Sequence, residues 1–161
     1  MRLPERRSWA TPIAGGLFAL FAGLAAWGVR DNSVTADEPV YLVRGYTAWR
    51  TGELELGVIN PPLAPLICAL PYLALRPSLP PPPSGGPATR HQPRRAGSAQ
   101  AAGNLLSFEM GREFLFHNRY SADTLLTAGR LPVLALGLVL LALVWRGSAS
   151  LWGETGGLLS L

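Results

Sequence analysis

The sequence contains no lysine and a single cysteine, and both scarcities exclude classes of site. One cysteine can form neither a disulfide within the chain nor a CxxC metal or redox motif. Cys68 stands in an apolar segment, which is typical of a small buried hydrophobic residue. All 14 basic residues are arginines, and they are scattered along the chain. Because no basic helix or recognition motif is present, we expect no nucleic-acid partner.

Charge is scarce as well: charged residues make up 15% of the 161 residues, whereas hydrophobic residues make up 48%. The apolar residues form blocks instead of alternating with polar ones, so the composition is not that of an ordinary soluble domain. The sequence therefore predicts an all-α integral membrane protein, with two spanning helices joined by a long extracytoplasmic loop.

The first apolar block, residues 8–29, contains no charged residue. A helix of that length extends about 33 Å at roughly 1.5 Å per residue, which exceeds the hydrocarbon core of about 30 Å. Trp9 and Trp27 stand near its two ends, where indole rings prefer to lie. Arginines precede the block at positions 2, 6 and 7. We therefore expect residues 1–7 in the cytoplasm, although Arg30 on the far side weakens this bias.

A cleaved signal peptide is the alternative, because Val34-Thr35-Ala36 is an acceptable small-residue cleavage pattern behind a basic N-terminus. However, the apolar block exceeds the roughly 7–15 residues that are usual for such peptides, and Arg30-Asp31-Asn32 intrudes before the cleavage pattern. We expect a multi-pass protein of the inner (plasma) membrane, with residues 30–123 on the periplasmic or extracellular side.

Residues 36–51 are predicted to form a helix that begins with two adjacent carboxylates, Asp37 and Glu38. Thr35 and Glu38 have the spacing of a capping box, Pro39 falls in the first turn, and a glycine at position 52 ends the helix. Both carboxylates then lie at the positive end of the helix dipole, which favours their ionised forms.

One face of this helix is apolar, with Leu42, Tyr46 and Trp49 at positions i, i+4 and i+7. Such a face suits two environments: an interfacial helix lying at the membrane surface, or a helix packed on other parts of the protein. The sequence leaves both open.

Residues 60–75 begin with Asn60-Pro61-Pro62, which predicts a rigid extended corner because a residue before proline is pushed away from the helical region. The apolar residues that follow are interrupted by prolines at positions 65 and 71, so they are too short to span and predict a re-entrant or interfacial element. Residues 76–103 contain four consecutive prolines and several arginines. This composition predicts a disordered linker, since it buries too little apolar surface to order itself.

Residues 104–116 are predicted to be helical, with Leu106, Met110 and Phe114 at positions i, i+4 and i+8 of one face. His117 follows without a cysteine or second histidine at ligand spacing, so it is interpreted as a solvated or capping residue, and no metal site is predicted.

Residues 124–145 are the second predicted spanning helix. The uncharged portion begins at Leu131 and covers about 22 Å at roughly 1.5 Å per residue, so crossing also needs the residues before it. Arg130 then lies in the outer part of the helix, where an arginine either snorkels or meets a partner. Arg146 marks the cytoplasmic end. Residues 146–161 are expected to form a cytoplasmic turn and the start of a truncated third helix, which indicates a partial chain.

An ordered set of motifs crosses the loop: Asp37-Glu38, Gly45-Tyr46, Gly52 and Asn60-Pro61-Pro62-Leu63. It resembles the first extracytoplasmic loop of the protein O-mannosyltransferases and of the bacterial glycosyltransferases of family 39. Arg130-Leu131-Pro132 is similar to their entry into the next helix, and Phe114-Leu-Phe-His117-Asn118 to what precedes it. Three features depart from the family: Asn60 replaces its usual His or Lys, the linker looks like an insertion, and the family has more spanning helices and a further domain.

The resemblance implies an N-terminal fragment of a multi-spanning GT-C fold that takes a sugar from a polyprenyl-phosphate donor to an acceptor hydroxyl on a protein, lipid or glycan. Asp37 would be the general base, and Glu38 would complete the cap or bind the acceptor or a divalent cation. Because negative charge builds on the departing phosphate, it needs a cation nearby. Arg130 is the first candidate and Arg44 the second. The corner formed by Asn60, Pro61 and Pro62 would hold the loop against the lipid head group.

Two other interpretations compete: a non-catalytic two-span membrane protein or gene remnant, and a secreted protein released after Ala36. We expect the isolated chain to be inactive, because one loop cannot enclose both donor and acceptor.

Overall fold

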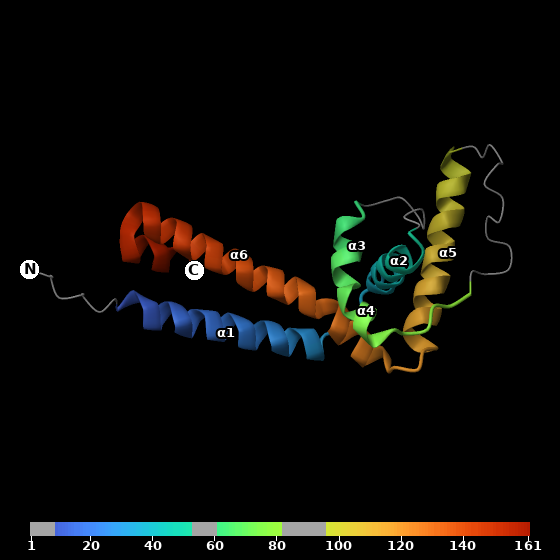
Figure 1. The fold of residues 1–161 in the computed structure, drawn as a ribbon, viewed down its shortest axis with the longest axis horizontal. Coiled ribbons are helices and arrows are strands. Elements are labelled where there is room, and N and C mark those ends of the chain that lie inside the picture. The colour runs from blue at the N-terminus through green and yellow to red at the C-terminus, as the bar shows by residue number, and fades with distance from the viewer. Residues whose placement is uncertain (1–8, 53–60, 82–95) are drawn as a thin grey trace, which may run out of the picture. The chain divides into compact units, whose positions relative to one another are not determined.

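The computed structural model describes residues 9–52, 61–81 and 96–161, with residues 96–104 described by their backbone alone (Figure 1). These residues form six α-helices and no strand. The predicted all-α class is thus confirmed for the part described. The chain divides into two compact units, one of residues 1–31 with 134–161 and the other of residues 32–133.

The first unit contains α1 (Ala10–Asp31) and the second part of α6 (Ala122–Leu159). The two helices pack through small and aromatic residues: the rings of Phe18 and Trp145 meet edge to face with centroids 6.2 Å apart. Phe21 lies against Gly137, where an added Cβ would be 3.4 Å from the ring. Both helices are long and apolar enough to cross a membrane.

The helical geometry of α6 breaks at Gly153, whose φ of 73° and ψ of −176° are not helical. The predicted turn directly after Arg146 is therefore wrong, because the chain remains helical up to Trp152. The Ser150 hydroxyl donates a 2.7 Å hydrogen bond to the Gly147 carbonyl one turn earlier, a contact that serine can make inside a helix. Glycine tolerates the positive φ at 153 at no steric cost, so the break falls there.

The second unit is built around α2 (Glu38–Thr51), which lies between α3 (Leu63–Cys68) and α5 (Ala96–Phe116) (Figure 1). Its core contains an aromatic cluster of Tyr46 from α2, Tyr72 from α4 (Leu70–Leu75) and Phe114 from α5, all without exposed surface. Their ring centroids are 5.5 to 6.0 Å apart. The Tyr72 hydroxyl donates a 2.6 Å hydrogen bond to the Leu125 carbonyl and joins α4 to α6.

Leu42 and Tyr46 are buried, so the apolar face of α2 packs on protein, the second of the two environments considered for it. Trp49 remains half exposed, and its indole N–H donates a 2.9 Å hydrogen bond to the Leu66 carbonyl of α3. The helix ends as predicted, because Gly52 adopts a left-handed φ of 75° and its N–H bonds to the Ala48 carbonyl.

The segment after residue 60 is more helical than expected. Pro62 has helical φ and ψ of −72° and −11° and stands at the N-terminal cap of α3, so only residues before it can be extended. Pro65 is buried within α3, where its carbonyl approaches Gly45 of α2. The short helices α3 and α4 therefore pack on α2.

The predicted linker is ordered at both ends. Residues 82–95 lie outside the described residues, but α5 begins at Ala96 and not at position 104. At the other end, Asn118 makes two hydrogen bonds with the backbone of Ser78. The Arg119 side chain donates 2.6 Å bonds to the carbonyls of Leu75 and Arg76. These side-chain donors satisfy the end of α4, which explains why a proline-rich segment is fixed there.

The first turns of α6 also pack on protein. Leu125, Leu126 and Ala128 are buried in the core of the second unit. Met110 and Phe114 are buried in the same core, as the predicted face of α5 requires.

Candidate functional site

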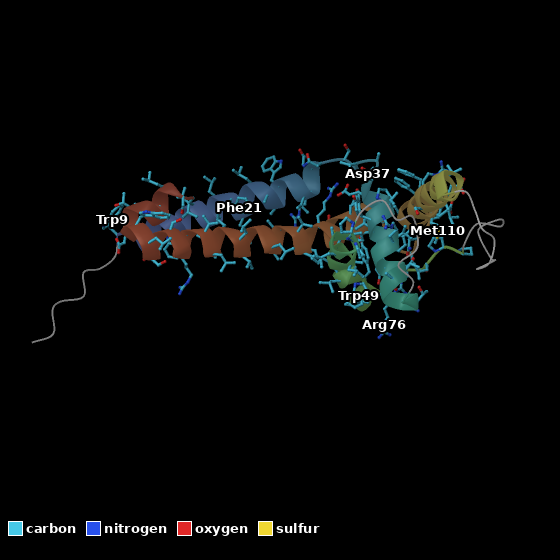
Figure 2. All side chains as sticks on the ribbon, turned by 90° about the horizontal axis from the view of Figure 1, so that it is seen from above. Trp9, Phe21, Asp37, Trp49, Arg76 and Met110 are labelled. Atoms are coloured by element: carbon cyan, nitrogen blue, oxygen red, sulfur yellow. The ribbon has the colours of Figure 1, made fainter. Side chains whose placement is uncertain are left out.

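The two adjacent carboxylates at the start of α2 have different surroundings. Asp37 stands at the N-terminal cap, yet its side chain makes no capping hydrogen bond and it is exposed. Its carbonyl accepts the Tyr41 N–H at 3.1 Å, so the helical geometry extends back to Asp37. Figure 2 shows Asp37 at one end of α2 and Trp49 near the other. Asp37 thus presents a carboxylate that has no role in closing the helix.

Glu38 is held by a bidentate ion pair with Arg130 from α6. Arg130 Nε lies 2.6 Å from Glu38 Oε1, and Arg130 Nη2 lies 2.7 Å from Glu38 Oε2. Glu38 Oε2 also accepts the Thr35 backbone N–H at 3.1 Å, which is the glutamate half of the predicted capping box. The planar guanidinium matches the carboxylate in this arrangement, which fixes its orientation.

Arg130 uses its remaining donors on the segment before α2. Its Nη1 donates to the Asn32 carbonyl at 2.9 Å and its Nη2 to the Ser33 carbonyl at 3.2 Å. We call Glu38, Arg130 and these two carbonyls the clamp. The clamp joins Asn32 and Ser33, at the entrance of the loop, to the start of α2 and to α6. Asp37 is the residue directly before Glu38 in the chain. The lipid-phosphate role that the resemblance implies for Arg130 therefore competes with four contacts within the protein.

The clamp keeps Glu38 ionised. The Arg130 hydrogen bond lowers the pKa of Glu38 from its ordinary value of 4.5, against a smaller rise from burial, and the Thr35 N–H lowers it further. Glu38 is therefore an acceptor for Arg130 at neutral pH and not a proton donor.

A groove of about 760 Å³ borders the start of α2. Its apolar lining comes from Ala36, Pro39, Pro80, Pro81, Phe108 and Met110, and its charged lining from Glu109, Arg112 and Glu113. Ala36 and Pro39 flank Asp37 in the chain, so the groove and that carboxylate share one end of α2. The volume lies within the range of about 300–1,000 Å³ usual for small-molecule sites.

The other predicted site residues are dispersed. Arg44 is buried in the second unit with 8% of its surface exposed, and this burial lowers its pKa. Pro61 and Pro62 stand at the start of α3 and are exposed, whereas Asn60 lies outside the described residues. Of the predicted residues, the structure thus brings Glu38 and Arg130 into contact, with Asp37 adjacent in the chain.

Sequence reasoning missed the groove and the two carbonyls of the clamp. Phe108 and Glu109 carry no motif, and a backbone carbonyl has no residue signature at all. Only Asn118 could have indicated the groove from the sequence, because an asparagine just after a helix often forms hydrogen bonds with the backbone. In the structure its amide bonds to the Ser78 backbone and so fixes the segment that leads to Pro80 in the groove lining.

Comparison with models of protein families, with curated proteins and with solved structures finds no match to this chain. The described residues contain no cluster of three or more metal-ligating side chains. What the fold defines is a helical protein with two helices that are long and apolar enough to span a membrane.

Proposed function

We propose that this chain is the first membrane-embedded part of a glycosyltransferase that takes a sugar from a polyprenyl-phosphate donor on the extracytoplasmic side. One observation carries the proposal: Asp37 is exposed and makes no capping hydrogen bond, while the adjacent clamp fixes the backbone that carries it. A carboxylate used only as a helix cap would instead bond to the first N–H groups of α2.

Asp37 acts on the acceptor in this proposal. The acceptor hydroxyl attacks C1 of the sugar, the bond from C1 to the phosphate oxygen breaks, and the hydroxyl proton passes to the Asp37 carboxylate. An ionised aspartate is a weak base at neutral pH, so most of its contribution is orienting the hydroxyl and stabilising its developing positive charge. The clamp contributes by fixing the start of α2 against the entrance of the loop.

The groove next to Asp37 suits the acceptor. Its proline and aromatic lining offers apolar contact, and its two glutamates and one arginine from α5 offer hydrogen bonds to hydroxyl or amide groups. Such a mixture of apolar walls and few polar groups is the usual composition of a ligand site.

The test is Asp37→Asn in the gene at its own locus, followed by transfer of radiolabelled sugar from a polyprenyl-phosphate donor in isolated membranes. Loss of a general base typically costs about 10²–10⁴-fold in rate, so transfer should fall by at least about a hundredfold while the amount of protein in the membrane is unchanged.

Asp31→Asn is the matched control, because Asp31 is an exposed acidic residue at the end of α1 and lies outside the clamp. Its transfer should equal that of the wild type. Transfer at the wild-type rate by Asp37→Asn would overturn the proposal.

A further inference from the structure

We infer that the outer face of α3 and α4 is a surface that contacts the lipid bilayer. Residues 63–75 contain no charged residue. The one hydroxyl among them, on Tyr72, is buried and bonded to the Leu125 carbonyl. The side chains that these two helices turn outwards are therefore apolar.

Helical periodicity separates a side of α3 and α4 that faces protein from a side that faces outwards. Pro65, Ala69 and Tyr72 are buried at positions i, i+4 and i+7, and they contact α2. Ala69, between the two helices, keeps helical φ and ψ of −85° and −6°, so the periodicity continues from α3 into α4. Leu63 and Leu70 are seven residues apart and are 65% and 44% exposed. They lie on the side away from α2.

Trp49, at the end of α2, adds an aromatic ring to this surface. Its side chain is 46% exposed, and its indole N–H already donates to the Leu66 carbonyl of α3 at 2.9 Å. The exposed part of the ring is therefore apolar, with its one donor satisfied, and indole rings of this kind prefer the boundary between membrane and water. We call Trp49, Leu63, Leu70 and Leu73, which is 40% exposed, the apolar face.

The apolar face belongs to helices that meet α6 just before α6 exposes apolar side chains. The Tyr72 hydroxyl of α4 bonds to the Leu125 carbonyl, and a Cβ on Gly129 would lie 2.8 Å from that hydroxyl. Leu131 and Val133 are already 50% and 54% exposed. Val133 follows Gly129 by about 6 Å along the axis, at roughly 1.5 Å per residue. The exposed apolar residues of α6 thus begin within about one turn of the contact with α4.

The occupant that we assign to the apolar face is the bilayer, and not a second copy of the chain or another helix. The second unit continues at one end into α1 and at the other into the apolar part of α6. When both helices span, the unit is tethered to the membrane surface at two points. Contact with lipid there requires no particular reaction at Asp37, which lies towards the other end of α2 from Trp49 (Figure 2).

The charge at the end of α4 also matches a lipid surface. Arg76 directly follows α4 and is exposed. Arg119 brings a second guanidinium to the same place, where it donates to the carbonyls of Leu75 and Arg76. Apolar side chains bordered by arginine are the usual composition of an element that lies in the interface, because the cations meet the phosphates of the head groups.

The test is spin labelling of the full chain in phosphatidylcholine vesicles. In a Cys68→Ser background, Leu63→Cys and Leu70→Cys each carry a nitroxide, and power saturation measures its collisions with oxygen and with a polar nickel chelate. Oxygen is apolar and concentrates in hydrocarbon, whereas the polar chelate is excluded from it. The ratio of oxygen to nickel collisions should be several-fold higher at both positions than at a position in water.

Leu105→Cys is the matched control in water. Leu105 is also an exposed leucine, at 63%, but it stands on α5, and α2 lies between α5 and α3. Its label should collide freely with the nickel chelate. Leu20→Cys in α1 is the reference in lipid, because Leu20 is 58% exposed on a helix long and apolar enough to span, and its label should favour oxygen.

Nickel collisions at Leu63 and Leu70 as frequent as those at Leu105 would overturn the inference, because the apolar face would then lie in water. Shielding of both labels from both reagents would also overturn it and would identify a protein partner. Spin–spin broadening that disappears on dilution with unlabelled chain would identify that partner as a second copy. A label at Leu20 that favours nickel would remove the tether and overturn it as well. Transfer by Asp37→Asn does not enter these measurements, so the two proposals fail separately.

Discussion

Asp37 and Glu38 are neighbours in the chain, but they point about 100° apart around the helix and meet different surroundings. Glu38 is paired with Arg130 and lies partly buried, whereas Asp37 is exposed and does not cap α2. These contacts give the two carboxylates different roles. Glu38 holds the start of α2 in place, and the exposed carboxylate of Asp37 is the one to which the proposed function assigns contact with the substrate.

We expect Glu38→Gln to destabilise the second unit by about 1–3 kcal/mol at pH 7, since it breaks a charge-assisted pair and leaves Arg130 partly buried without its counter-ion. The pKa of Glu38 is lower in the folded chain than its ordinary 4.5, so the pair stabilises the fold above about pH 4.5 and this contribution is lost as the pH falls through the folded pKa. Thermal unfolding between pH 3 and 7 measures it. The wild-type curve should approach the Glu38→Gln curve on acidification, and parallel curves would contradict the role of the pair.

The local half of this arrangement could be predicted from the sequence, but the distant half could not. Thr35 and Glu38 are three residues apart, a spacing at which a capping contact is expected. Arg130 is 92 positions from Glu38, and the partners predicted for it from the sequence were a lipid phosphate and the membrane surface. Which partner it takes depends on how α6 packs, and neither hydropathy nor spacing determines that.

At the level of helices, close backbone contact decides how α2 meets α3. A Cβ on Gly45 would overlap the Pro65 carbonyl and lie 2.9 Å from the Ala69 side chain. The sequence indicated Gly45 only as part of a motif, because a crossing of two helices is not visible in either one alone. The same limit applies to the environment of α2: periodicity identified the apolar face, but lipid and protein are equally compatible with it.

Gly45→Ala should therefore lower the unfolding free energy of the second unit by about 1–3 kcal/mol, the usual cost of overpacking a tight contact. Gly23→Ala is the control, since Gly23 lies within α1 with open space where a Cβ would be added, and alanine there should be neutral or stabilising. Chemical denaturation followed by near-ultraviolet circular dichroism of the tyrosine cluster reports on the second unit. Equal stability of Gly45→Ala and wild type would contradict the close contact of α2 with α3.

For the molecule as a whole, α6 belongs to both units, and its side chains have different surroundings in each. Its first turns bury Leu125 and Leu126 in a protein core, while its later residues are apolar and largely exposed, as expected for lipid contact. Hydropathy alone merged these two parts into one predicted span, because leucine is equally suited to a protein core and to lipid. The apolar and exposed part of α6 thus begins after the residues that complete the second unit.

The proposed function requires the second unit to lie outside the cytoplasm, and the single native cysteine makes this testable. In a Cys68→Ser background, Ser33→Cys places an exposed thiol just before α2 and leaves the Ser33 carbonyl free to accept from Arg130. A membrane-impermeant maleimide should label it in intact cells, because arginines before an apolar segment favour a cytoplasmic N-terminus. Arg7→Cys in the same background is the control and should be labelled only after permeabilisation. The reverse pattern would place Asp37 in the cytosol, where a donor presented on the extracytoplasmic side cannot reach it, and would refute the proposed glycosyl transfer whatever the behaviour of the clamp.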